Sequence, residues 1–229
     1  EIFKTKAVGP ADHRPMDANS QIARLYLSAA EFVDSEHPLV VEWARRLRSA
    51  EPAETARAAF LFVRDLVYGP PDFDRLDSFK ASDLLARGGG YCVPKACAFV
   101  ALCRAAGVPA RLAFADVTNH LATPSTLELM GGDVFAWHGY AEVLLDGRWL
   151  KVSPTFDAPL CARMGVAPLR FDGRSDAHLQ AYDAEGRTFM SYDRQHGTFH
   201  DAPARFLAAE MPRLYPRAYA AIRDGRFSR

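Results

Sequence analysis

The stretch that decides the fold spans residues 88–111 and reads GGGYCVPKACAFVALCRAAGVPAR. Its three glycines interrupt regular structure, and apolar residues then recur over 94–106 with the period of a helix that Gly107 ends. Cys92 therefore stands at the N-terminus of a central helix. Unpaired backbone N–H groups and the helix dipole favour a thiolate at that end, so we expect Cys92 to be a nucleophile.

Cys92 has a competing interpretation, because most free cysteines are small buried hydrophobes. The glycine run before it and a suitable histidine partner favour the nucleophile, whereas Cys97 and Cys103 keep the buried interpretation. Rises of about 7.5 and 9 Å separate these three positions along the helix, which is beyond disulfide reach. Together with Cys161 they are expected to be free thiols. They lack the paired spacing of a zinc site, so neither a metal nor a cofactor is expected.

The composition is that of an ordinary globular protein, with 229 residues, 49% hydrophobic and 24% charged. Lys plus Arg equals Asp plus Glu at 28 each, so no overall field attracts nucleic acid. No stretch is long and apolar enough for a membrane span, and no signal-peptide centre stands near the start. We therefore expect a cytoplasmic protein with no nucleic-acid or membrane partner. The chain starts at Glu1, which leaves a trimmed leader open, and the oligomeric state is open too.

The order of elements indicates an α+β domain with an antiparallel sheet. Helices are expected over residues 22–32, 39–47, 52–67 and 82–87, strands over 111–117, 136–145 and 148–152, and a last helix over 202–222 that Pro216 kinks. We expect one domain over residues 1–229, with an N-terminal arm (1–17), a core (about 53–157) and a C-terminal extension (158–229). The segments 121–133 and 160–201 are expected to be irregular and to shape a substrate pocket.

Asp146-Gly147 is a strong two-residue hairpin signal, and it fixes which residues of two strands face each other. The register pairs Leu145 with Arg148, Leu144 with Trp149 and Glu142 with Lys151, the last as an ion pair. Extended further, it places His138 opposite Thr155, with Ser153 and Asp157 as the diagonal neighbours of His138.

A catalytic cysteine needs a base, and histidine has the fitting pKa. His138 starts a predicted strand beside Gly139, which leaves room for a neighbouring group, and His120 is its one serious rival. The remaining histidines occupy polar, loop-like surroundings and are expected at the surface: His13, His37, His178, His196 and His200. Asp157 is the charged diagonal neighbour of His138. A carboxylate there would hold the imidazole and stabilise the imidazolium, with an ordinary loop carboxylate as the equal alternative.

These residues resemble the transglutaminase-like superfamily of cysteine enzymes, in particular a bacterial subgroup, over residues 78–157. The carriers are GYC at 90–92, AFVALCRAAGVPAR at 98–111, Trp137-His138 with Glu142, GRW at 147–149 and SPT at 153–155. The resemblance implies a papain-like core, in which the helix that starts at Cys92 packs against an antiparallel sheet carrying the histidine and an acidic residue.

One position departs from the family pattern. Family members usually have Asp-Pro-Thr where this chain has Ser153-Pro154-Thr155. Three explanations are open. Asp157 replaces the missing aspartate, or Ser153 orients His138 without a charge, or catalysis is weak or absent.

The resulting hypothesis is a Cys92–His138–Asp157 triad for acyl transfer or amide hydrolysis. Cys92 attacks an amide or thioester carbonyl, backbone donors hold the oxyanion, His138 moves the proton and Asp157 orients His138. Water or an amine then resolves the acyl-enzyme, so the expected partners are peptide, amide or thioester substrates. Two alternatives stay open, namely a cyclase acting on a carrier-bound acyl chain and an inactive binding module of the same fold.

Overall fold

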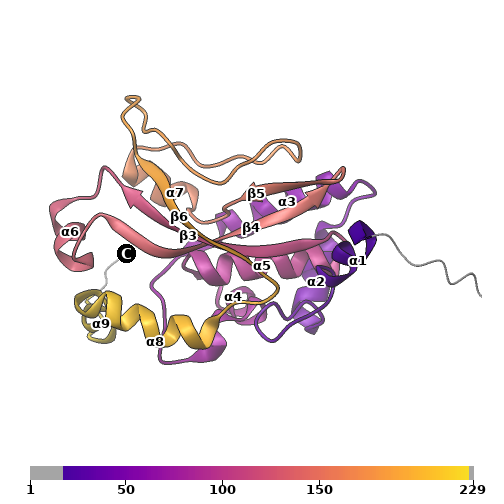
Figure 1. Cartoon of the computed structure of the whole chain (residues 1–229), viewed down its shortest axis with the longest axis horizontal. Helices are drawn as coiled ribbons and strands as arrows, with labels where there is room; N and C mark the ends of the chain where they lie inside the picture. The colour runs from indigo at the N-terminus through magenta and orange to yellow at the C-terminus, as the bar shows by residue number, and fades with distance from the viewer. Residues whose placement is uncertain (1–17, 227–229) are drawn as a thin grey trace, which may run out of the picture.

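The computed structural model describes residues 18–226, which form an α+β fold built on a four-stranded sheet (Figure 1). The strand order is β5-β4-β3-β6, and each neighbouring pair is antiparallel. The strands are β3 (Ala110–Asn119), β4 (Val134–Leu145), β5 (Arg148–Val152) and β6 (Met190–Phe199). The predicted fold class is confirmed. The predicted arm over residues 1–17 lies outside the described residues.

Helix α5 (Cys92–Ala105) occupies the centre of the molecule. Its sequence is apolar on nearly every side, which is typical of a helix enclosed by protein, and residues 93–104 are all buried. It packs against β3 and β4 and is flanked by three more helices (Figure 1), namely α2 (Pro38–Leu47), α3 (Pro52–Asp65) and α4 (Ala81–Arg87). The boundaries predicted for these helices are confirmed to within a few residues. No helix within residues 18–226 has the length and apolar character that crossing a bilayer requires.

Short elements lead the chain into α5. After α3, strand β1 (Val67–Tyr68) pairs in parallel with β2 (Gly89–Gly90), and the 3-10 helix η1 (Leu76–Phe79) lies between them in sequence. Gly89 lies so close to β1 that an added Cβ would fall 2.5 Å from the Val67 carbonyl oxygen. The glycine run therefore brings the chain against β1 immediately before Cys92.

The C-terminal extension contains regular structure where an irregular segment was expected. The segment expected to be irregular over 160–201 holds most of α7 (Ala158–Met164) and β6, and the expected loop over 121–133 holds α6 (Pro124–Met130). Helices α8 (Ala204–Leu214) and α9 (Pro216–Arg223) correspond to the last predicted helix, over 202–222. In Figure 1 the orange chain between α7 and β6 lies on one side of the sheet, and the yellow helices α8 and α9 lie on the other. The prediction missed β6 because it is an edge strand whose middle residues are polar and exposed.

Two predicted helices differ in extent. The first, α1 (Ala18–Leu25), ends seven residues before the predicted limit at Phe32. The last is divided, because Pro216 begins α9 instead of kinking one continuous helix.

The predicted hairpin register is confirmed from Glu142 opposite Lys151 to Leu145 opposite Arg148. The expected ion pair between Glu142 and Lys151 is wrong, because Glu142 pairs with Arg111 of β3, whose Nη2 lies 2.6 Å from Glu142 Oε2. Glu142 is buried, and the guanidinium of Arg111 lies within ion-pair distance of it, whereas Lys151 on the edge strand forms no ion pair with it among the described residues. The ladder between β4 and β5 ends at Ala141 opposite Val152, before the residues of the expected site.

Candidate active site

Cys92 is the first residue of α5, and it is half-buried. Pro94 has no N–H, and the Lys95 N–H is already bonded to Tyr91 O at 3.2 Å. The backbone amides of Gly139, Val93 and Cys92 itself act on the sulfur and favour its thiolate. Cys92 therefore lies among backbone donors of two elements, α5 and β4, which is the arrangement an oxyanion requires.

The thiol itself is not activated in the free protein. Burial raises the pKa of Cys92 to about 11, and the three backbone amides and the charge of Lys95 only partly oppose that shift. The lowered pKa expected from the helix N-terminus is thus wrong, because desolvation of the thiolate outweighs the donors. At neutral pH Cys92 is a thiol.

Gly139 brings the start of α5 against β4. An added Cβ at Gly139 would lie 3.0 Å from Val93 Cγ2 and 3.1 Å from Val93 Cα, closer than side chains normally pack. Cys92 precedes Val93 and His138 precedes Gly139, so this contact brings the backbone at the cysteine close to the backbone at the histidine. No hydrogen bond joins Cys92 Sγ to the His138 ring within residues 18–226. Such contacts are commonly loose until substrate binds.

His138 is a neutral imidazole held by a hydroxyl. Burial, with a smaller contribution from the nearby His178, lowers the pKa of His138 to about 4. Its Nε2 lies 3.2 Å from Ser153 Oγ, which lies 2.8 Å from Thr155 Oγ1. In the described chain, this serine is the one hydrogen-bond partner of the ring. Ser153 therefore occupies the position beside the histidine that the family gives to an aspartate.

Asp157 uses both carboxylate oxygens elsewhere. Its Oδ2 accepts the Tyr68 N–H at 2.7 Å, and its Oδ1 caps α7 by accepting the Leu160 N–H at 2.8 Å. Its charge also acts on buried Lys95, whose pKa burial lowers to about 8 while Asp157 opposes the shift. The structure thus joins His138 to Ser153, places Cys92 against the backbone of Gly139, and ties Asp157 to β1 and α7.

Replacing Asp157 with alanine is expected to lower stability while leaving His138 unchanged. The substitution leaves the Tyr68 and Leu160 N–H groups unpaired, which should cost about 2–4 kcal/mol in urea unfolding. The matched control is Asp172→Ala, because Asp172 also accepts two backbone N–H bonds, from Arg174 and Ser175, but is exposed. If NMR titration showed a further fall in the pKa of His138 upon Asp157→Ala, Asp157 would be its charged partner after all.

Two histidines predicted at the surface contribute to the site region instead. His178 follows Ala177, which forms a bridge beside Val152, and its ring stacks on Tyr192 at 5.0 Å. Tyr192 in turn lies 6.2 Å from the His138 ring. His196 is also largely buried, with 9% of its side chain exposed. No sequence pattern marks either residue, because His196 belongs to the unpredicted strand β6 and His178 to the chain before it.

His120, the rival base, lies elsewhere on the sheet. Its Nε2 lies 2.8 Å from Ser191 Oγ in an exposed pair between the end of β3 and β6. No three His, Cys, Asp or Glu side chains gather as metal ligands within the described chain. All four cysteines are free, as predicted.

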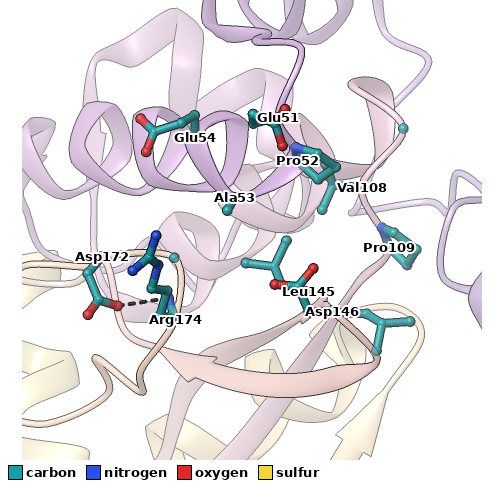
Figure 2. Close-up of a pocket in the computed structure, with 13 residues that line it drawn as sticks. Glu51, Pro52, Ala53, Glu54, Val108, Pro109, Leu145, Asp146, Asp172 and Arg174 are labelled. Carbon is teal, nitrogen blue, oxygen red and sulfur yellow. Dashed lines mark hydrogen bonds between the residues drawn. The ribbon is translucent and has the colours of Figure 1, made fainter.

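A separate cavity of about 530 Å³ lies away from Cys92 and His138. Figure 2 shows it between the start of α3, at Glu51 and Pro52, and the tip of the β4–β5 hairpin at Asp146, with Arg174 at its wall. Neither Cys92 nor His138 lines it. The candidate chemistry at Cys92 therefore does not lie in this cavity.

The cysteine at a helix N-terminus, packed on an antiparallel sheet that carries a histidine, defines the papain-like class of cysteine-enzyme folds. Residues 41–154 match the model of the transglutaminase-like superfamily. Through this segment the chain belongs to that superfamily, and the resemblance predicted from the sequence is confirmed.

Similarity to solved structures is distant. A candidate cysteine protease from Cytophaga hutchinsonii is 16% identical with a TM-score of 0.45, and the match covers 81% of this chain and 55% of that one. The periplasmic domain of TgpA from Pseudomonas aeruginosa is 23% identical with a TM-score of 0.43, covering 61% and 48%. This chain thus spans about half the length of the structures it matches. Among curated proteins nothing matches.

Proposed function

We propose that the protein is a cysteine-dependent acyl-transfer enzyme that cleaves an amide or thioester. Cys92 is the nucleophile, His138 the base, and Ser153 the group that holds the base. The observation that supports this proposal is the contact between Gly139 and Val93, because it brings the start of α5 against β4 at the residue that follows His138, where backbone donors surround Cys92. The substrate class, peptide or other amide or thioester, and the cytoplasmic location stay predictions.

The chemistry starts from a neutral pair. With the Nε2–H donating to Ser153, Nδ1 of His138 is free to take the Cys92 proton as sulfur bonds to the carbonyl carbon. The oxyanion that forms is held by backbone N–H groups at the start of α5. His138 then returns the proton to the leaving amine or thiolate. Water or an amine attacks the thioester carbonyl and loses its proton to His138, and His138 passes that proton to the departing sulfur, which restores the neutral pair.

The best second candidate is a binding module that has kept the fold without the activity. One observation favours it: His138 is held by a hydroxyl, so no carboxylate stabilises the imidazolium that catalysis forms. Alkylation of Cys92 in the wild type and in His138→Ala separates the enzyme from the binding module, because in a binding module the reactivity of Cys92 would not depend on His138.

Iodoacetamide is expected to alkylate Cys92 at least about tenfold faster than the three fully buried cysteines at pH 7, as read by peptide mapping. His138→Ala should slow Cys92 alkylation by about 10- to 100-fold, because the thiol then lacks its base. Since the pKa of Cys92 is raised to about 11, its rate should rise with pH through neutrality and not reach a plateau there.

The control for the base is His120→Ala, which removes the rival histidine and should leave the rate unchanged. Hydrolysis of fluorescein-labelled casein, with Cys92→Ala as the blank, tests turnover on peptide bonds. Equal alkylation of Cys92 in the wild type and in His138→Ala would contradict the proposed function.

A further inference from the structure

A bulge in β4 immediately precedes His138. Ala115 of β3 pairs with His138 and Val117 pairs with Phe135, so Asp116 alone faces two residues, Ala136 and Trp137. Side chains alternate between the faces of a strand, and one extra residue therefore decides the face that the next side chain takes. This bulge determines the direction of the His138 ring.

Trp137 occupies the bulge in a conformation that bulky residues avoid. Its φ is 58°, in the left-handed region, where a bulge normally has glycine. Its N–H donates to Asp116 Oδ1 at 3.0 Å, and the Ala136 N–H donates to Tyr215 Oη at 2.6 Å. Side chains thus replace the strand partners that the bulge removes, and Asp116 holds the strained residue itself.

A second bulge, in β6, brings His196 to the same carboxylate. Phe114 pairs with Gly197 and Ala115 pairs with Gln195, which leaves His196 as the extra residue. Its Nε2 lies 2.6 Å from Asp116 Oδ1, and its ring stacks on Trp137 at 3.9 Å with 6° between the planes. One carboxylate therefore joins two bulged strands, and the two bulged side chains cover each other.

We infer that Asp116 and His196 are positioning residues that hold the β4 bulge at Trp137 and thereby aim His138 at Cys92. They act through the backbone of Trp137 and do not contact the reacting atoms. This inference rests on the proposed function, because the aim of the ring matters only if His138 is the base.

The test compares substitutions that keep one contact with substitutions that remove it. Asp116→Ala should slow alkylation of Cys92 by iodoacetamide about 10- to 100-fold, since small displacements of a reacting group have effects of that size. Asp116→Asn keeps an oxygen for the Trp137 N–H and should stay within about threefold of the wild type. Similarly, His196→Phe keeps the stack on Trp137 and should be less impaired than His196→Ala.

Two further measurements distinguish a positioning role of Asp116 from a purely structural one. Long-range ¹H–¹⁵N NMR of the His138 ring should show a changed tautomer balance in Asp116→Ala and the wild-type balance in Asp116→Asn, each recorded where circular dichroism shows a folded protein. Thr118→Ala removes another side-chain bond between β3 and β6, to Asp193, and should change neither the rate nor the ring signals.

The outcomes distinguish the two hypotheses. If His138→Ala leaves the wild-type rate unchanged, the proposed function fails, and the NMR signals alone decide whether Asp116 aims the ring. If His138 matters but Asp116→Ala keeps both rate and tautomer, the positioning role is overturned. Should Asp116→Ala not fold, the comparison of His196→Phe with His196→Ala decides: equal rates in these two variants and the wild type overturn it.

Discussion

Gly139→Ala is expected to reduce the reactivity of Cys92 about 10- to 100-fold at pH 7. The added methyl group would lie 3.0 Å from Val93 Cγ2 and 3.1 Å from Val93 Cα. A backbone atom cannot rotate away as a side chain can, so the start of α5 must move from β4 and take Cys92 with it. We also expect a loss of about 1–3 kcal/mol in urea unfolding, the usual cost of overpacking.

Gly132→Ala is the matched control for this change. Gly132 lies just before β4, its φ is outside the left-handed range, and an added Cβ there would meet nothing within 4 Å. It should therefore leave both the alkylation rate and the unfolding free energy near wild-type values. Wild-type behaviour of Gly139→Ala in both measurements would show that the close contact between α5 and β4 is not needed.

Ser153→Asp is expected to raise the reactivity of Cys92 by at least about tenfold, because a carboxylate stabilises the imidazolium that forms when His138 takes the proton. An opposite charge within about 4–6 Å favours the charged form of a histidine. The pKa of His138 should therefore rise from about 4 by about 1–3 units, as NMR titration would show.

The lowered pKa of His138 also makes the stability of the folded protein depend on pH. The folded protein holds His138 with a pKa of about 4 against an ordinary value of 6.5, so the unfolded chain binds the proton more readily. The wild type should then lose stability as the pH falls from about 6.5 towards about 4. In Ser153→Asp the higher pKa of His138 should reduce that loss.

Ser191→Asp is the control for the added charge, because it places an aspartate on His120 in the equivalent serine–histidine pair at the exposed end of β3. It should leave Cys92 reactivity unchanged. A Ser153→Asp protein with the wild-type rate and the wild-type pKa of His138 would show that Ser153 does not act on the base.

The features that were predicted correctly from the sequence are those set by residues close together in the chain. The glycine run and the apolar period place Cys92 at the first position of α5, and Asp146-Gly147 sets the register of β4 and β5. Both depend on residues close together in the chain, so turn and helix rules are sufficient. The pairing of Cys92 with His138 stays a prediction, and what the structure adds is the close approach of Gly139 to Val93, the residues that follow them.

The remaining features depend on residues far apart in the chain. Asp157 is bound by the Tyr68 N–H, 89 positions earlier, and no local pattern reveals such a partner. The raised pKa of Cys92 follows from burial by several elements, which a helix N-terminus alone does not indicate. The left-handed conformation of Trp137 could not be predicted either, because the usual sequence sign of a positive φ is a glycine and this position holds a tryptophan.

Strand β6 lies outside the segment that matches the superfamily, yet it completes the sheet. The superfamily segment ends at residue 154, yet the strand that covers β3 comes from residues 190–199. A fragment stopping at 154 would leave the full length of β3 as an open edge, ready to pair with another copy, and would also lack His196. One late segment therefore both closes the edge of β3 and supplies the histidine that contacts Asp116.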